Sequence, residues 1–225
     1  MKTFKALEVE RISDAIYKAI IEQRLKAGTR LVETRLADIF SANRNHVRAA
    51  IEHLSLRKVV TVETNKGAYV ANPGPEECKE IFLARRVVEC GMISDAAKQC
   101  TRQDFQRLQD ILDRERQAET GKSRQGLVKE SGEFHLELAR IHGNRRLYEI
   151  LEDLVASSSL VSGLYEKNDD FSDTINEHDI IFNAIRKKEY DSLPALMAGH
   201  LSSIERKLLL RYQEQESPDL ESIFA

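Results

Sequence analysis

The chain has 225 residues, of which 41% are apolar and 32% charged, so it can bury a core in one or two domains. It contains no apolar run near the roughly 18 residues that a membrane span requires, and its first ten residues do not resemble a signal peptide. Its three cysteines lack CxxC spacing and suit a reducing cytosol. These features predict a cytoplasmic protein without a membrane partner.

The charge is unevenly distributed along the chain. Residues 1–72 carry 13 Lys and Arg against 8 Asp and Glu, a net charge of +5. Residues 73–225 carry 21 against 29, a net charge of −8. A basic N-terminal third beside an acidic remainder indicates that only the N-terminal part meets a polyanion.

The first predicted element is an amphipathic helix over about residues 9–24. Its apolar side chains recur at helical spacing: Ile12, Ala15, Ile16, Ala19 and Ile20. Ala27-Gly28 ends this helix, and Thr29 to Val32 has the length of a short strand.

Residues 33–54 have the pattern of two short helices with a tight break between them. Thr34 is the expected N-cap of the first helix, Ser41-Ala42 forms the break, and Asn43 caps the second helix. The second helix turns four apolar side chains inward: Val47, Ala50, Ile51 and Leu54. Arg44 and Arg48 are four residues apart, so they share one face, and it is not the apolar one.

A short helix that presents two arginines, braced by a preceding helix, is typical of a protein that reads the DNA major groove. The alternative is an ordinary helical hairpin with solvated arginines. The next segment favours DNA binding, because Val60 and Val62 alternate with polar residues and Tyr69 to Ala71 follows a turn at Gly67. This β-hairpin would be a wing with Lys66 at its tip, where it can reach phosphate.

The predicted fold is mainly α: an N-terminal winged helix-turn-helix domain over residues 1–72, and a C-terminal antiparallel all-α bundle of about six helices over residues 76–212. Pro73-Gly74-Pro75 separates the two. The six helices are expected at about residues 76–99, from Thr101, 123–142, 144–167, 173–187 and 191–211. Residues 213–225 are polar and acidic, and are expected to form a loose tail.

Caps support four of these helices. Thr101 and Asp104 have the spacing of a capping box, and Gly143 suits a left-handed C-cap. Asn144 is expected to cap the fourth helix, and Ser172 or Asp173 the fifth.

Three histidines fall on the apolar stripes of three different helices, namely His135, His178 and His200. A buried imidazole needs a partner, and three converging imidazoles can share a cation. Zinc or a nickel-like ion suits three neutral imidazoles. Two alternatives remain: three unrelated core histidines, or direct binding of an anionic ligand. Arg85 either binds the carboxylate of a ligand or pairs with Glu89 on a helix surface.

In its motifs the chain resembles the GntR family of transcription regulators, of the FadR type with an FCD effector domain. The N-terminal motifs are Ala27-Gly28-Thr29-Arg30-Leu31, Leu36-Ala37-Asp38, residues 43–51 and residues 65–70. The C-terminal motifs are residues 85–89, Phe134-His135 followed by Gly143-Asn144, Glu177-His178 and His200-Leu201. Both arginines of the family's reading helix are kept, whereas Ser41, Asn43, Asn45, His46 and Ala49 depart from its pattern.

The resemblance implies a homodimer that binds a palindromic double-stranded operator and answers to a small organic acid, with repression the commoner mode. The residues expected to contact DNA are Thr34, Arg35, Asn43, Arg44, Asn45, His46, Arg48, Lys66 and Gly67. The three histidines are expected to bind a divalent metal beside the effector, with Arg85 on the effector. Ser131 stands where the family has an aspartate ligand, and it could hold a metal-bound water.

Two other functions compete with this prediction. A metal with an open coordination position is also an enzyme site, but Glu130, Glu133 and Glu177 are not spaced to point at the histidines, so no enzyme is predicted. The other competitor is a regulator for which the metal ion itself is the signal.

Overall fold

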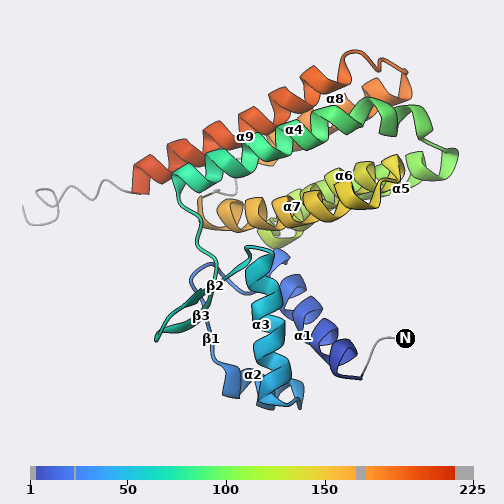
Figure 1. Ribbon diagram of the computed structural model, residues 1–225. Helices are drawn as coiled ribbons and strands as arrows, with labels where there is room; N and C mark the ends of the chain where they lie inside the picture. Colours follow the sequence, from blue (N-terminus) through green and yellow to red (C-terminus); the bar gives the residue numbers. More distant parts are fainter. Residues whose placement is uncertain (1–3, 23, 166–170, 216–225) are drawn as a thin grey trace, which may run out of the picture.

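The computed structural model describes residues 4–22, 24–165 and 171–215, arranged as two lobes (Figure 1). The smaller lobe holds the N-terminal elements: α1 (Phe4–Ile21), β1 (Arg30–Leu31), α2 (Glu33–Phe40), α3 (Arg44–Leu56), β2 (Val60–Glu63) and β3 (Gly67–Val70). The larger lobe is made of helices: α4 (Pro75–Gln99), α5 (Arg102–Thr120), α6 (Arg124–His142), α7 (Arg145–Tyr165), α8 (Phe171–Arg186) and α9 (Leu193–Gln215). The predicted winged helix-turn-helix followed by a helical bundle is confirmed.

The three strands form one antiparallel sheet in the order β1-β3-β2. Val60 lies opposite Val70, and Glu63 lies opposite Gly67 at the turn end of the hairpin. Gly67 has a φ of +110°, a backbone conformation that residues with a Cβ rarely adopt. The wing therefore has the position and the turn chemistry that the sequence predicts.

The break between α2 and α3 also agrees with the prediction. Ser41 takes the left-handed conformation with a φ of 49°, and the Oδ1 of Asn43 accepts a hydrogen bond from the backbone N–H of Asn45 at 2.8 Å. The predicted cap at Thr34 is wrong. The carbonyl of Val32 already accepts from the N–H of Leu36, so the first turn closes before Thr34, and Val32 lies at the cap position.

Several helix ends differ from the prediction. α1 begins at Phe4 rather than near residue 9. The periodic pattern missed its first turns because Phe4 and Leu7 are exposed and do not continue the buried stripe. α8 begins at Phe171, and the carboxylate of Asp173 pairs with Lys207 of α9 instead of capping the helix. α9 packs along α4 and continues to Gln215, so the predicted tail from residue 213 begins inside a helix. Residues 166–167 and 216–225 of these predictions lie outside the described residues.

The caps inside the bundle follow the sequence closely. Thr101 and Asp104 form a capping box at the start of α5. Gly143 ends α6 with a φ of 77°, and the Oδ1 of Asn144 accepts from the backbone N–H groups of Arg146 and Leu147. None of the described helices is long and apolar enough to cross a membrane.

Each lobe has its own hydrophobic core, and α7 contributes to both. Leu151, Val155 and Val161 belong to the core of the bundle, whereas Ala156 and Leu160 are buried in the core of the N-terminal lobe. α7 accordingly lies on the side of the bundle that faces α1 and α3 (Figure 1). This shared helix fixes how the two lobes sit against each other.

Candidate DNA-binding face and histidine site

The predicted DNA-contacting residues lie on one part of the N-terminal lobe, formed by α2, α3 and the wing. Val47, Ala50, Ile51 and Leu54 fill the buried side of α3, as predicted. All of the nine predicted residues are exposed except His46, which is partly buried: Thr34, Arg35, Asn43, Arg44, Asn45, His46, Arg48, Lys66 and Gly67. The face is therefore accessible to a duplex.

Glu33, at the start of α2, pairs with both arginines of α3. Its carboxylate accepts from the Nε and Nη2 of Arg48 at 2.9 and 2.8 Å, and the Nη2 of Arg44 lies 3.7 Å away. The hydrogen bonds from Arg48 lower the pKa of the Glu33 carboxyl, so it stays ionised. Sequence reasoning missed Glu33, because the 15 residues that separate it from Arg48 leave no periodic signal.

The tip of the wing is also held by neighbouring side chains. Arg30 Nη2 and the hydroxyl of Tyr69 both donate to the carbonyl of Lys66 at 3.1 Å. The Nζ of Lys66 pairs with Glu63 at 2.9 Å. These contacts hold the backbone at the tip of the wing, where the side chain of Lys66 is exposed.

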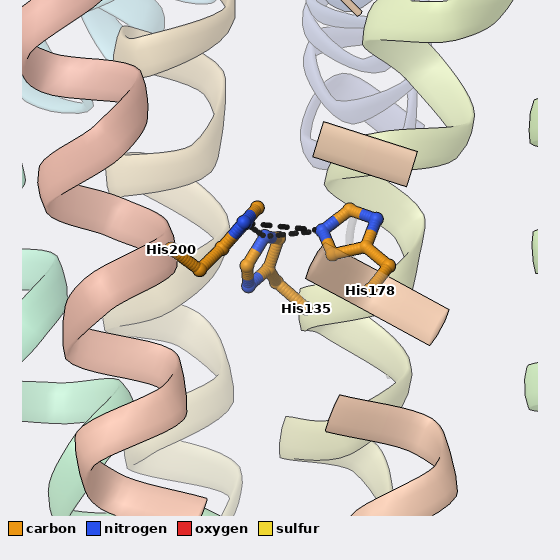
Figure 2. Close-up of side chains that lie close together, drawn as sticks. All are labelled: His135, His178 and His200. Carbon is orange, nitrogen blue, oxygen red and sulfur yellow. Dashed lines mark hydrogen bonds between the residues drawn. The ribbon is translucent and has the colours of Figure 1, made fainter. Parts of the chain in front are cut away.

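In the bundle, the structure brings the three predicted histidines together from α6, α8 and α9 (Figure 2). His135, His178 and His200 are at most 2% exposed. Their Nε2 atoms lie 3.4 Å apart for His178 and His135, 3.1 Å for His178 and His200, and 3.2 Å for His200 and His135.

A carboxylate lies behind each imidazole, on the Nδ1 side. Glu89 of α4 lies 2.5 Å from His135 Nδ1, and Glu115 of α5 lies 3.0 Å from His178 Nδ1. Glu177 of α8 lies 2.9 Å from His200 Nδ1. The expectation that Glu177 points away from the histidines was therefore wrong. Glu130 is turned away, since it pairs with Arg114 and Lys129.

Sequence reasoning did not assign Glu89 or Glu115 to the site, although the signal for Glu115 was present. Glu115 continues the apolar stripe of α5 that runs through Leu108, Ile111 and Leu112, and it is 1% exposed. A carboxylate on a buried stripe needs a partner. Here the partner is an imidazole.

The donor set fits a divalent cation. An ionised carboxylate at Nδ1 requires the proton on that nitrogen, so each neutral imidazole turns the lone pair of its Nε2 toward the other two. Three lone pairs at 3.1–3.4 Å repel one another unless a cation lies between them. Nitrogen ligands about 2.0–2.1 Å from one zinc ion would be separated by about 3.3 Å, close to the spacing observed.

The pKa directions of His135, His200 and Glu89 agree with this arrangement, whereas burial raises the pKa of Glu177. Burial lowers the pKa of His135 to about 4, although the charge of Glu89 opposes the shift. Burial, together with the other two histidines, holds the pKa of His200 well below its usual value. Burial alone would raise the pKa of Glu89, but Arg85 and His135 lower it to about 2. Neutral imidazoles and an ionised carboxylate are the forms that metal binding requires.

Arg85 is buried beside this site and pairs with Glu89, whereas its binding of a ligand carboxylate stays a prediction. Its Nε donates to Glu89 at 2.7 Å and its Nη1 to the Oγ of Ser158 at 3.1 Å, so the Glu89 pair lies in the interior and not on a helix surface. Among the residues that the structure describes, neither its Nη2 nor the Oγ1 of Thr174 has a hydrogen-bond partner. Both residues line a cavity of about 30 Å³ that also borders His135 and Ser131.

A winged helix-turn-helix lobe joined to an all-α lobe with a polar internal site is the architecture of a DNA-binding transcription regulator. Comparison with known protein families identifies both parts. The FCD domain family matches residues 80–203, more than half of the chain, and the family described as bacterial regulatory proteins, gntR family, matches residues 8–70. The chain belongs to the GntR family, in the FadR-like subfamily with an FCD domain.

Characterised relatives agree with this assignment. The chain is 29% identical to the Uxu operon regulator of Haemophilus influenzae, over 88% of this chain and 80% of that protein. It is 24% identical to the transcriptional repressor RspR of Escherichia coli, over 93% of this chain and 92% of that protein. A GntR transcriptional regulator from Rhodococcus sp. RHA1 has the same fold, with a TM-score of 0.81 at 24% identity over 89% of this chain and 97% of that one. The family and these relatives are transcription regulators and not enzymes.

Proposed function

We propose that this DNA-binding regulator represses a metabolic operon in the bacterial cytoplasm, as a homodimer on a palindromic operator, and that a small organic acid bound in the helical lobe controls it. The observation that carries the proposal is the histidine site: three converging imidazoles, each backed by a carboxylate, beside a cavity into which a buried guanidinium offers an unpaired N–H group. The relatives described as operon regulators and repressors support the repressor role.

The DNA-binding part of the proposal rests on α3. Arg44 and Arg48 are exposed and lie outside the buried stripe of α3. An arginine that pairs with guanine contributes about 1–3 kcal/mol of base discrimination. We expect Arg44→Ala and Arg48→Ala each to weaken binding to a duplex selected from a random library by the wild type. Arg145→Ala, an exposed arginine of α7, is the control for lost charge. Unchanged affinity in both α3 variants would reject α3 as the reading helix.

The histidine part of the proposal is a divalent metal held by His135, His178 and His200. When bound, such an ion supplies a positive charge that a carboxylate can ligate. The Nη2 of Arg85 would bind the same carboxylate, and the hydroxyls of Ser131 and Thr174, which line the same cavity, would hydrogen-bond to other oxygens of the organic acid. Ser131 is neutral, so it adds no further negative charge beside the three carboxylates.

Metal analysis of protein purified without chelators tests the site. We expect close to one equivalent of zinc or a similar ion per chain in the wild type, and loss of that ion in His178→Ala. His142→Ala, at the end of α6, is the matched histidine control. A wild type without stoichiometric metal rejects the metal site. Thermal shifts with small carboxylates then identify the effector, because a ligand that binds only the native state raises the melting temperature.

A second candidate is that the ion itself is the signal. The observation that favours it is the small cavity, whose 30 Å³ holds one or two waters, since a water requires roughly 10–15 Å³. An organic effector must therefore widen the cavity. Operator affinity measured without metal, with zinc, and with zinc plus a small carboxylate separates the two candidates. An organic-acid effector changes the affinity of the zinc-loaded protein further, whereas an ion that is itself the signal exerts its full effect alone.

A further inference from the structure

α7 packs against the N-terminal lobe with one face and against the histidine site with the other. Ala156 and Leu160 are buried in the N-terminal core. Val155, Ser158 and Ser159 line the cavity beside the histidines. Because packed interfaces deform little, a displacement of α7 at the cavity must also shift the residues of α7 that pack against the N-terminal lobe.

On the N-terminal side, one residue of the DNA-binding lobe holds α7. Arg57, the C-cap of the reading helix α3, donates from its Nε to Asp153 at 2.5 Å and from its Nη2 to Glu152 at 2.7 Å. Its guanidinium lies 3.8 Å from the centre of the Tyr17 ring. The hydroxyl of Tyr17 donates to the backbone carbonyl of Glu152 at 2.9 Å. Thus α1, α3 and α7 meet at a single guanidinium.

On the cavity side, a continuous series of polar contacts leads from α7 to the histidines. The Oγ of Ser158 accepts from Arg85, Arg85 pairs with Glu89, and Glu89 contacts the Nδ1 of His135. All four side chains are buried. A change in charge at the Nε2 of His135 therefore acts on groups that contact α7 directly.

We infer that Arg57 is a positioning residue, which ties the orientation of α3 to that of α7 and so makes DNA affinity depend on occupancy of the histidine site. This inference rests on the proposed function, because it assumes that the site is occupied in one state and empty in another. An occupant shifts the equilibrium only if it favours one arrangement of α7 over the other.

The burial of Arg57 determines how strongly a displacement of α7 is transmitted to α3. The side chain of Arg57 is 17% exposed, so its charge is largely removed from water. Pulling α7 away would leave that charge without its partners, which costs more than it would at an exposed surface pair. A displacement of α7 is therefore expected to move the C-terminal end of α3 with it.

The experiment measures DNA affinity with and without zinc for the full-length chain, using the duplex selected by the wild type. Removing Arg57 would leave two carboxylates unpaired and endanger folding, so the main variant is the double substitution Glu152→Gln and Asp153→Asn. Arg57→Lys, which keeps the charge and loses the two-pronged geometry, is the second variant. Glu149→Gln, on an exposed turn of α7, is the control.

We expect zinc to change the affinity of the wild type and of Glu149→Gln at least fivefold, about the lower end of common allosteric couplings. In the double variant and in Arg57→Lys, the ratio of the DNA affinities with and without zinc should fall below twofold. The zinc stoichiometry and the circular dichroism spectrum should be unchanged. Variants that keep the full wild-type ratio would overturn the role of Arg57. A wild type that binds zinc without any change in DNA affinity would overturn the coupling through α7 and leave the metal site intact. A wild type that binds no zinc rejects the proposed site itself, and the inference with it.

Discussion

At the scale of single residues, Glu33 sets the geometry of the two arginines that are expected to read bases. Its carboxylate occupies the Nε and Nη2 of Arg48, which leaves the Nη1 of that guanidinium and the outward hydrogen of Nη2 free to bind guanine. Holding the arginine in place reduces the entropy lost on binding. The same carboxylate repels the phosphate backbone, which weakens sequence-independent contact.

Glu33→Ala is therefore expected to affect two kinds of binding in opposite directions. Affinity for the selected duplex should fall severalfold, because the arginines lose their fixed orientation, while affinity for unrelated DNA should rise. Titrations of both duplexes at a fixed salt concentration measure the ratio of the affinity for the selected duplex to that for unrelated DNA. Asp38→Ala removes a charge from the same helix without touching the arginines and should raise both affinities together. An unchanged ratio in Glu33→Ala would show that Glu33 does not position the arginines.

Glu115 illustrates how a residue can act on a metal site without being a ligand. It is expected to fix the tautomer of His178 through the Nδ1 contact at 3.0 Å. Changing a carboxylate in this position commonly costs about 10–100-fold in metal affinity, so Glu115→Gln should weaken zinc binding by that order. Competition with a chromophoric chelator measures it. Glu119→Gln, one turn further along α5, should bind zinc like the wild type; equal affinities in the two variants would argue against this role.

At the scale of elements, the features that depend on neighbouring residues in the sequence were predicted better than those that depend on tertiary contacts. Asn43, Gly67 and Gly143 act within a few residues of themselves, and the turn or cap that each one predicts is present. The predicted cap at Thr34 is wrong because α2 already begins at Glu33. Capping preference alone does not determine the first residue of a helix.

The partners of the histidines lie 46 and 63 residues away along the chain, for Glu89 and Glu115 respectively. Glu89 and Glu177 both belong to motifs that the sequence singled out, but neither was predicted to contact a histidine, and Glu177, next to His178 in sequence, contacts His200. Periodicity placed the histidines on inward faces. It could not say which carboxylates from other helices would meet them.

The close approach of α6 and α7 gives a prediction at the element scale. A Cβ at Gly132 would lie 2.9 Å from the Cγ1 of Val155, on the wall of the cavity. Gly132→Ala must push the two helices apart, and overpacking of this kind costs about 1–3 kcal/mol. Urea denaturation measures the change.

Gly91→Ala in α4 is the matched control for Gly132→Ala, since no atom of the described residues lies within 4 Å of its added Cβ. Alanine is the better helix former, so this variant should be more stable than the wild type by about 0.5–1 kcal/mol. Gains in stability for both variants would show that α6 and α7 pack less tightly than described.

At the scale of the whole molecule, the two cores are joined through α7. The N-terminal core is completed by Ala156 and Leu160, which come from a helix of the other lobe. Tyr17 is buried against the same helix, and α1 packs on it. The stability of the DNA-binding lobe should therefore depend on a residue that lies in the effector domain by sequence.

Leu160→Ala tests this dependence, with Leu112→Ala as its counterpart, because Leu112 is fully buried within the bundle core alone. Each truncation of a buried leucine is expected to cost about 2–5 kcal/mol. Hydrogen exchange of the amides in α1 and α3 distinguishes the two. Leu160→Ala should accelerate their exchange by opening the N-terminal core, whereas Leu112→Ala should mainly accelerate exchange in α5 and α6. If Leu160→Ala left α1 and α3 as protected as in the wild type, the N-terminal core would be independent of α7, and a signal from the histidine site would need another route to the DNA.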